Sequence, residues 1–210
     1  MLPSEPATPV LSYGVRRNEL TELHYITPIS NLASILKRGI LSHVRCQKIP
    51  HLSVAMQEIQ DRRDGVVVPG GRALHEYANL YICARNPMLY KRGGQHEQLC
   101  VLRVTPDVLD VPGTVVTSGN ASSQYVRFGA GVAGLGIVDR ALTFAEFWTH
   151  QDPIEYFRRK SAKCAEVLVP DRVDPGLIVG AYVSGDVGRA ALSAASAALP
   201  PTINEHLFFL

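Results

Sequence analysis

The stretch Ala165-Glu166-Val167-Leu168-Val169 decides how the chain folds, because it is an apolar run with one carboxylate inside it. A short run of this kind is typical of a strand. Side chains alternate along a strand, so Glu166 shares a face with the apolar Leu168, and that face is not fully exposed to water. A partly buried glutamate in a cleft is a candidate for transition-state work. A glutamate that simply points to solvent is the alternative interpretation.

Other short apolar runs bounded by glycine, proline and aspartate predict the rest of a sheet. They cover residues 23–27, 66–68, 80–84, 99–104, 115–117 and 177–183. The expected helices are few and short. They follow Ser30 as far as Gly39, follow Ser53 as far as Arg63, and cover 144–148, 154–163 and 187–198. The pattern predicts an α+β domain with more strands than a Rossmann unit of this size has.

The composition fits one compact domain. The chain has 210 residues, of which 46% are hydrophobic and 19% are charged, enough to bury a proper core. Residues 1–22, with three prolines and no periodicity, predict a loose N-terminal tail, and the domain is expected to cover 23–210. No window is apolar enough to cross a bilayer, and the first 22 residues lack the apolar core of a secretory signal. A cytoplasmic protein without membrane contact is therefore expected.

The cysteines predict no special chemistry. Cys46, Cys83, Cys100 and Cys164 are scattered without a C-x-x-C pair. Cys83 and Cys100 lie in apolar runs, where a thiol behaves as a small buried hydrophobe. We therefore expect neither a disulfide framework nor a metal site.

Charge is unevenly distributed along the chain. Residues 23–103 hold 11 Lys/Arg against 5 Asp/Glu, whereas residues 104–210 hold 8 against 11. A basic half suits a partner that carries phosphates, since neutralising phosphates releases counterions. A solvated surface with uneven charge is the simpler alternative.

A glycine pattern resembles a dinucleotide-binding turn without its context. Gly129, Gly131 and Gly134 match G-x-G-x-x-G, but no clear strand precedes them. Gly136 interrupts any helix that would follow. A mobile glycine-rich loop is the expected structure.

Two polar positions have a structural and a functional interpretation. Arg62 and Arg63 end a predicted helix, where unpaired carbonyls favour positive charge. Capping accounts for one arginine, and the second is free to make a forked contact with a phosphate or carboxylate. His24 and Tyr25 lie on the first predicted strand, where such residues are usually structural, although they could hydrogen-bond a carboxamide.

Several stretches taken together resemble the DarT family of DNA-modifying toxins. The most specific runs from His75-Glu76-Tyr77 through Tyr81 to Arg85-Asn86-Pro87-Met88-Leu89-Tyr90. The resemblance covers about residues 22–210 in order and with plausible spacing. The other matching stretches are 23–36 with Gly39 and Ile40, 59–63, 165–169, and the aromatic ending 208–210.

The resemblance implies an ADP-ribosyltransferase fold, with a split, bent β-sheet core and short flanking helices. It implies that NAD⁺ is held in the cleft and consumed as co-substrate, without a metal. Family members attach ADP-ribose to a base in single-stranded DNA and act as toxins. A partner antitoxin with a macrodomain usually removes the modification.

The family's functional residues map onto this sequence one by one. The resemblance places the NAD⁺-binding tripeptide on Tyr25-Ile26-Thr27, with further NAD⁺ contacts on Ser34 and Ser42. It places the catalytic arginine on Arg63, which also contacts NAD⁺, and the catalytic glutamate on Glu166.

One position departs from the family pattern. Tyr25 stands where the family usually has histidine, and His24 is displaced by one residue, so it should point to the opposite face of the strand. Tyrosine can still donate to a carboxamide or stack on a ribose. The departure weakens any inference about which base is modified.

The expected mechanism assigns complementary roles to the two catalytic residues. Glu166 would stabilise positive charge that develops on the ribose as nicotinamide leaves. Arg63 would hold the pyrophosphate or position and polarise the acceptor, because a guanidinium is a poor base. Tyr125 or Phe128 would stack on the unpaired acceptor base. An enzyme of the same fold acting on RNA or protein, and an inactive nucleic-acid-binding relative, are the alternatives.

Overall fold

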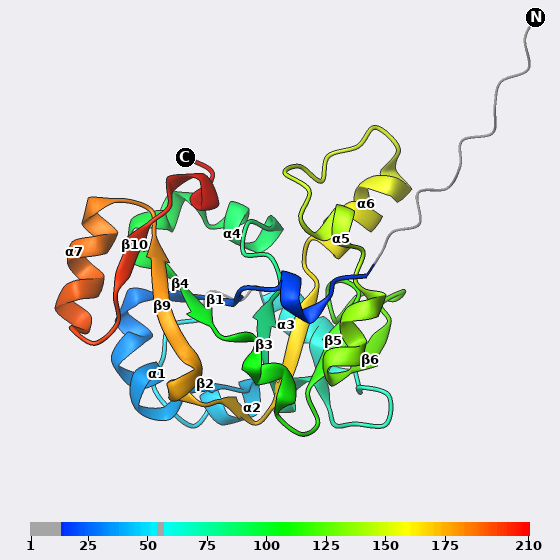
Figure 1. The fold of residues 1–210 in the computed structure, drawn as a ribbon, viewed down its shortest axis with the longest axis horizontal. Helices are drawn as coiled ribbons and strands as arrows, with labels where there is room; N and C mark the ends of the chain where they lie inside the picture. The colour runs from blue at the N-terminus through cyan, green and yellow to red at the C-terminus, as the bar shows by residue number, and fades with distance from the viewer. Residues whose placement is uncertain (1–13, 54–56) are drawn as a thin grey trace, which may run out of the picture.

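The computed structural model describes residues 14–53 and 57–210 (Figure 1). Its centre is an eight-stranded sheet in the order β10-β9-β4-β1-β3-β7-β5-β6, and β2 and β8 form a separate pair. The strands are β1 (Leu23–Pro28), β2 (Ile40–Leu41), β3 (Tyr77–Tyr81), β4 (Leu99–Val104), β5 (Val115–Thr117), β6 (Phe128–Ala130), β7 (Glu166–Pro170), β8 (Arg172–Val173), β9 (Ile178–Val183) and β10 (Pro201–Ile203). The helices are α1 (Leu32–Arg38), α2 (His43–Cys46), α3 (Gln57–Asp64), α4 (Pro87–Lys91), α5 (Arg140–Thr143), α6 (Pro153–Ala162) and α7 (Asp186–Ala195).

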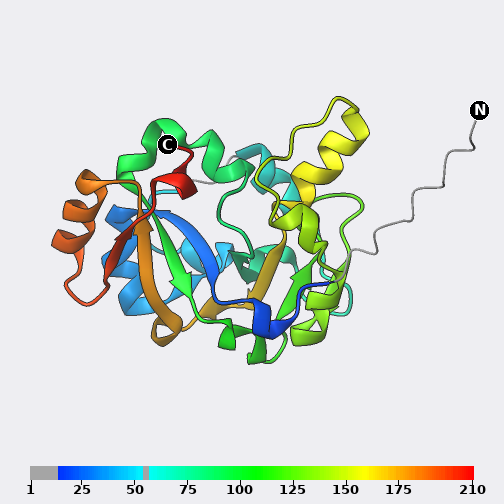
Figure 2. The same ribbon diagram turned by 45° about the horizontal axis from the view of Figure 1, so that its top comes forward.

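The large sheet is split beside β1. This strand pairs with β4 along its whole length, from Leu23 to Pro28, whereas it meets β3 only where His24 faces Tyr81. Strands β10-β9-β4-β1 therefore form one half and β3-β7-β5-β6 the other, on either side of this junction (Figures 1 and 2). The expected α+β fold with a split, bent sheet and short flanking helices is confirmed.

Both faces of β1 and β4 are covered, which explains why their sequences are almost continuously apolar. On one face, Leu23 and Leu102 pack with Leu32 of α1 in the larger core. On the other face, Ile26 and Val101 belong to a second cluster that includes the C-terminal segment. The apolar runs predicted as strands are confirmed at β1, β4, β5, β7 and β9, and β3 begins before its predicted range.

The predicted strand at 66–68 is wrong. Only Val67 forms a bridge, with Ala73, and its side chain is 64% exposed. The chain reverses directly after Val68, at a turn where Gly70 has φ +67°. A run of three valines followed at once by Pro69 and two glycines is too short to form a ladder.

The predicted helix at 144–148 is also wrong. Helix α5 ends at Thr143, and the side chain of Asp139 caps its start by accepting from the N–H of Leu142. The following backbone is irregular, and the carbonyls of Ala145 and Glu146 accept from side-chain cations of distant residues. Tertiary hydrogen bonds thus replace the local ones that a helix would use.

Helix starts differ in detail from the prediction. Ser30 lies in a 3₁₀ turn, and α1 starts after Asn31, whose side chain does not cap the helix. Asn31 instead pairs with the backbone of Leu52, donating to its carbonyl at 2.7 Å and accepting from its N–H at 3.0 Å. The predicted helix from Ser53 agrees with α3 over 57–64, and the part at 54–56 lies outside the described residues.

The described part of the expected N-terminal tail packs against the domain. Val15 and Leu20 are buried in the larger core, and the N–H of Val15 donates to the carbonyl of Leu135. Residues 14–22 therefore belong with the packed part of the chain, although the prolines that predicted a loose tail lie outside the described residues.

The expected loop around the glycine pattern is wrong, since it is regular structure. Gly129 lies in β6, and a 3₁₀ helix follows over Gly131–Ile137. A Cβ added at Gly129 would lie 2.6 Å from the Cα of Gly134. These two glycines therefore allow β6 and the 3₁₀ helix to pack backbone against backbone.

Within the described residues, no helix combines the length and apolarity that a bilayer crossing requires. The same residues contain no group of three or more His, Cys, Asp or Glu side chains placed to hold a metal ion.

Candidate active site

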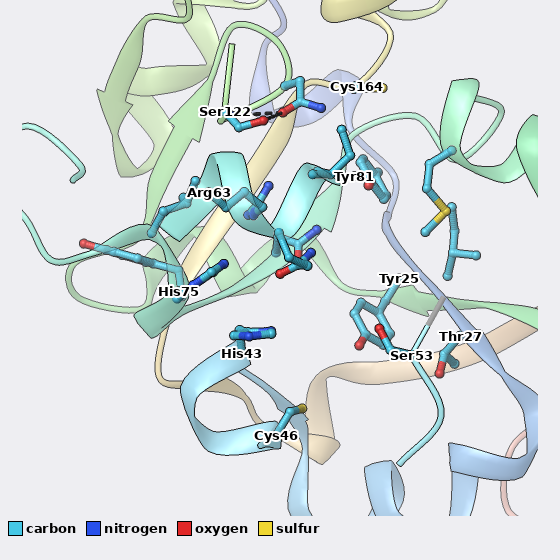
Figure 3. Close-up of a pocket in the computed structure, with 18 of the residues that line it drawn as sticks. Tyr25, Thr27, His43, Cys46, Ser53, Arg63, His75, Tyr81, Ser122 and Cys164 are labelled. Carbon is cyan, nitrogen blue, oxygen red and sulfur yellow. Dashed lines mark hydrogen bonds between the residues drawn. The ribbon is translucent and has the colours of Figure 1, made fainter. Parts of the chain in front are cut away.

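A pocket of about 800 Å³ lies where the two halves of the sheet separate (Figure 3). Its walls come from β1, α1, the 39–53 segment, α3, β3 with the residues before it, α4, the 120–124 segment and α6. This volume is within the range of pockets that hold small molecules and cofactors. The sheet junction therefore creates a binding site between distant parts of the sequence.

Arg63 and Glu166 meet in a buried ion pair beside this pocket. Nη1 of Arg63 lies 3.1 Å from each carboxylate oxygen of Glu166. The Glu166 side chain is 1% exposed and that of Arg63 is 8% exposed. Arg63 lines the pocket and Glu166 does not, so the pocket presents the guanidinium, with the carboxylate behind it. The two residues predicted to act together are in contact, although 103 positions separate them.

Two further bonds fix the position of Glu166. Its backbone N–H donates to Oγ1 of Thr117 on the neighbouring strand β5 at 3.0 Å. The same hydroxyl donates to the carbonyl of Gly119 at 2.6 Å, which holds the turn after β5. In that turn, the N–H of Ala121 donates to Oε1 of Glu166 at 3.0 Å. A backbone N–H and an arginine thus hold the carboxylate in a fixed position.

Strand β1 supplies the opposite wall. Tyr25, Ile26 and Thr27 all line the pocket, as does Ser34 of α1. The Thr27 hydroxyl accepts from the side chain of Asn31 at 3.2 Å. Burial raises the pKa of the Tyr25 hydroxyl well above its ordinary value, so this group is a hydrogen-bond donor at neutral pH.

Ser42 differs from the other candidate residues because it is not among the described residues that line the pocket. It is buried at the start of α2, where its N–H donates to the carbonyl of Asp171 and its own carbonyl accepts from Cys46. Its neighbours Leu41 and His43 do line the pocket. Ser42 therefore holds a wall of the site rather than facing it.

His24 points away from the pocket, as its displacement along β1 predicted. Its Nε2 contacts Glu22 at 3.1 Å, and Glu22 also accepts from Arg103 and from the hydroxyl of Tyr182 at 2.7 Å. Burial opposes the charged form, but hydrogen bonds from these three side chains lower the pKa of Glu22 to about 2. The cluster ties β1 to β4 and β9 on the face opposite Tyr25.

Two histidines in the pocket were given no role from the sequence, although His75 lies in a stretch that matches the family. The rings of His43 and His75 lie 4.3 Å apart, and both line the pocket below Arg63 (Figure 3). Burial lowers the pKa of both, with the charge of His75 adding to the effect on His43 and that of Arg63 to the effect on His75. Neutral imidazoles therefore sit beside the guanidinium at neutral pH.

The pairing of β3 with β7 explains where two further lining residues lie. Tyr81 lies directly opposite Glu166 in the β3–β7 ladder, and burial, together with the charge of Glu166, raises its pKa. Asn79, two positions earlier on the same face, also lines the pocket. Period-two alternation along β3 could have grouped these two residues. The backbone donor at Ala121 left no signal in the sequence.

The pocket is basic. Its described lining residues include more lysines and arginines than carboxylates, and the carboxylate among them is Glu58. Charge of this sign suits a ligand that carries phosphates. The basic side chains are Arg62, Arg63, Lys91 and Lys160.

The fold and this site agree with known proteins. A sequence model of the family described as "ssDNA thymidine ADP-ribosyltransferase, DarT" matches residues 24–205. The "DNA ADP-ribosyl transferase-DNA ADP-ribosyl glycohydrolase fusion protein" of Thermosipho africanus is 32% identical over 200 residues, covering 90% of this chain and 49% of that protein. The chain thus spans about half the length of the fusion protein. A "DNA ADP-ribosyl transferase" of a Thermus species is 31% identical over 157 residues, covering 69% of this chain and 74% of that protein.

A solved structure agrees over almost the whole chain. The structure of "Thermus sp. 2.9 DarT in complex with ADP-ribosylated ssDNA" superposes with a TM-score of 0.78 at 26% identity, covering 92% of this chain and 99% of that one. The family match contains both members of the buried ion pair, Arg63 and Glu166. From the pocket at the split sheet, the buried pair and these matches, we conclude that the chain belongs to the DarT family of ADP-ribosyltransferases.

Proposed function

We propose that this chain transfers ADP-ribose from NAD⁺ to the thymine base of single-stranded DNA. The observation that carries the proposal is the buried Arg63–Glu166 pair beside a basic pocket. A buried carboxylate held in place by fixed donors is suited to a reaction in which positive charge develops. The choice of thymine rests on the family's description, and that of single-stranded DNA also on the Thermus sp. 2.9 complex.

The pocket fits NAD⁺ as co-substrate. Its volume of about 800 Å³ and its basic lining suit a dinucleotide with a pyrophosphate. We assign binding to Tyr25, Ile26, Thr27 and Ser34, which line the pocket, whereas Ser42 supports the part of the lining formed by Leu41 and His43. When bound, NAD⁺ supplies the electrophilic ribose carbon.

Glu166 is assigned to stabilise positive charge on the ribose as nicotinamide leaves. Its interaction with the sugar strengthens in the transition state, so it lowers the barrier rather than tightening ground-state binding. Since Arg63 lies between the pocket and the carboxylate, the guanidinium has to move aside when the sugar reaches Glu166. Arg63 then contacts the pyrophosphate or the acceptor base, and it positions the acceptor without removing a proton.

The acceptor base is assigned to the side of the pocket formed by the 120–124 segment. Tyr125 follows that segment directly and is 90% exposed, so it can stack on an unpaired base. Phe128, the second aromatic candidate, packs against the core cluster around Leu168 and is less available. The partner that reverses the modification is assigned as a macrodomain antitoxin, because one relative is fused to a DNA ADP-ribosyl glycohydrolase. We place the reaction in the cytoplasm, where NAD⁺ and single-stranded DNA occur together.

The test is transfer of labelled ADP-ribose from NAD⁺ to separate acceptors. Single-stranded DNA with thymine should be labelled, and DNA without thymine, RNA and protein should not. Glu166→Gln should lower the transfer rate about 100- to 1,000-fold, as loss of an electrostatic stabiliser typically does. Glu97→Gln is the matched control, because Glu97 is exposed and outside the pocket. Label in RNA or protein alone contradicts the acceptor, and an active Glu166→Gln variant contradicts the role of Glu166.

A further inference from the structure

Residues 143–148, here called the entrance segment, connect two walls of the pocket. On the open side of the pocket, exposed lining residues include Lys91 of α4 and Phe157 of α6. The entrance segment contacts both helices. The Thr143 hydroxyl donates to the carbonyl of Ala162 at the end of α6, and Trp148 packs edge-on against a tyrosine of α4. Figures 1 and 2 show the connection from α5 to α6 passing on the side that faces α4.

Two cations hold this segment in place of local hydrogen bonds. Nζ of Lys163 donates to the carbonyl of Thr143 at 3.2 Å and to that of Ala145 at 2.6 Å. Nη1 of Arg85 donates to the carbonyl of Glu146 at 3.0 Å. Both cations lie close in sequence to the strand ends at this edge of the site, because Lys163 is three residues before Glu166 and Arg85 follows β3, the neighbour of β7.

Lys163 is unusual because it is a fully buried lysine with a side chain 1% exposed. Its third donor contact is the sulfur of Cys83 at 3.3 Å, so all three ammonium hydrogens have a partner. None of these three described partners is a carboxylate. The carbonyls of Thr143, at the end of α5, and of Ala145 supply the compensating negative potential. Burying an ammonium group costs free energy, whereas a lysine at the surface does not have this cost.

Arg85 anchors the other end of the segment. Its guanidinium lies over the ring of Phe209, 4.1 Å from the centroid, and its Nε donates to the carbonyl of His206. Phe209 in turn packs edge-on against Trp148 at 5.9 Å. The C-terminal segment, α4 and the entrance segment are therefore joined around one arginine.

We propose that Lys163 is a positioning residue for the acceptor strand: by holding the entrance segment, it sets the spacing between α4 and α6 at the open side of the pocket. The inference rests on the proposed function and adds a residue that does not contact NAD⁺. In this proposal the nucleic acid reaches the pocket between α4 and α6 and its base reaches the 120–124 segment, whereas NAD⁺ is held mainly by β1 and α1. Loss of Lys163 should therefore affect the acceptor more than NAD⁺.

Glu166 is held independently of Lys163. Thr117 binds its backbone and Ala121 its carboxylate, and the carbonyl of Ala165 accepts from Ile82 across the sheet. A substitution at Lys163 should therefore release the entrance segment without moving the carboxylate.

The experiment compares Lys163→Met with the exposed control Lys37→Met in the full chain. In Lys163→Met, the KM for a thymine-containing single-stranded oligonucleotide should rise about tenfold or more, equivalent to about 1.4 kcal/mol. The KM for NAD⁺, and the rate of NAD⁺ hydrolysis without DNA, should stay within about twofold. Trp148 is the chain's one tryptophan and lies in the entrance segment, so acrylamide quenching of its fluorescence reports the segment directly and should increase.

Lys163→Arg and Arg85→Met complete the test. Lys163→Arg keeps the charge, so its KM for the oligonucleotide should lie between those of the wild type and Lys163→Met. If Lys163→Met does not fold, Arg85→Met tests the other anchor of the entrance segment and should also raise the KM for the oligonucleotide. An unchanged oligonucleotide KM despite stronger quenching would overturn the inference, as would equal rises in both KM values. A wild-type chain that labels no oligonucleotide instead contradicts the proposed function.

Discussion

At the scale of the residue, the carboxylate that we propose for catalysis also belongs to a buried ion pair. The Glu166 carboxylate accepts from the guanidinium of Arg63 and from the backbone N–H of Ala121. Removing one partner of a buried ion pair leaves a charge without compensation, which costs far more than removing both. Activity and stability therefore depend on the same two side chains.

The first stability prediction concerns this pair. Arg63→Met should lower the free energy of unfolding by about 3–5 kcal/mol, because it leaves the Glu166 carboxylate buried without its cation. The double variant Arg63→Met, Glu166→Leu should be more stable than Arg63→Met alone, since no charge remains. Urea unfolding of the wild type and the variants measures both differences. A double variant less stable than Arg63→Met would show that the pair is not the source of the loss.

Glu22 predicts a dependence of stability on acid. Burial disfavours its charge, but bonds from His24, Arg103 and Tyr182 lower its pKa to about 2, and the unfolded chain has the ordinary value of 4.5. The folded state therefore binds this proton less readily than the unfolded state. The contribution of the Glu22 carboxylate to the free energy of unfolding is fully present above about pH 5 and is lost as the pH falls towards 2. Between pH 5 and 3, the melting temperature of Glu22→Gln should fall less steeply than that of the wild type, and parallel curves would contradict the assignment.

At the scale of the element, the pairing of β5 with β7 positions the strand that carries Glu166. The Thr117 hydroxyl accepts from Glu166 and donates to Gly119, so one side chain links the strand to the turn that provides the N–H of Ala121. Thr117→Val keeps the shape but leaves these groups unpaired. We expect a loss of about 1–3 kcal/mol in unfolding free energy and a lower kcat, with both restored in part by Thr117→Ser. Full activity in Thr117→Val would show that the turn is held by other contacts.

The elements also show what the sequence could predict. Runs such as Leu99 to Val104 predicted strands correctly because both faces of the strand are covered, and burial leaves a strong apolar signal. Strands β6 and β10 were missed because each is three residues long and lies at a sheet edge. The entrance segment was predicted as a helix because local pattern cannot show that Lys163 and Arg85 bind its carbonyls.

The site was predictable in part for a similar reason. Glu166 could be found because a carboxylate in an apolar run is conspicuous. The pattern singled out the pair Arg62 and Arg63, and only the family resemblance chose Arg63. The contact of Arg63 with Glu166 depends on the fold, which brings α3 against β7. His43 and His75 had no such local signal, since a histidine near a turn is common and their stacking across the pocket is tertiary.

At the scale of the whole molecule, the binding pocket exists because the sheet is split. Tyr25 and Thr27 belong to one half, and Tyr81 and Glu166 belong to the other. The halves share a single residue pair at the junction. A ligand in the pocket therefore contacts both halves and should stabilise them as one unit.

This arrangement predicts that NAD⁺ raises the melting temperature even without turnover. The Glu166→Gln variant removes the reaction while Tyr25, Thr27 and Ser34 still line the pocket. At a concentration of 100 times Kd, binding to the folded state alone contributes about 2.7 kcal/mol, which corresponds to a shift of roughly 5–10 °C for a chain of this size. Adding Tyr25→Ala to Glu166→Gln should abolish most of the shift, because the substitution removes a side chain of β1 that lines the pocket. If the double variant keeps the full shift, NAD⁺ binds elsewhere, and the assignment of β1 as its binding strand is wrong.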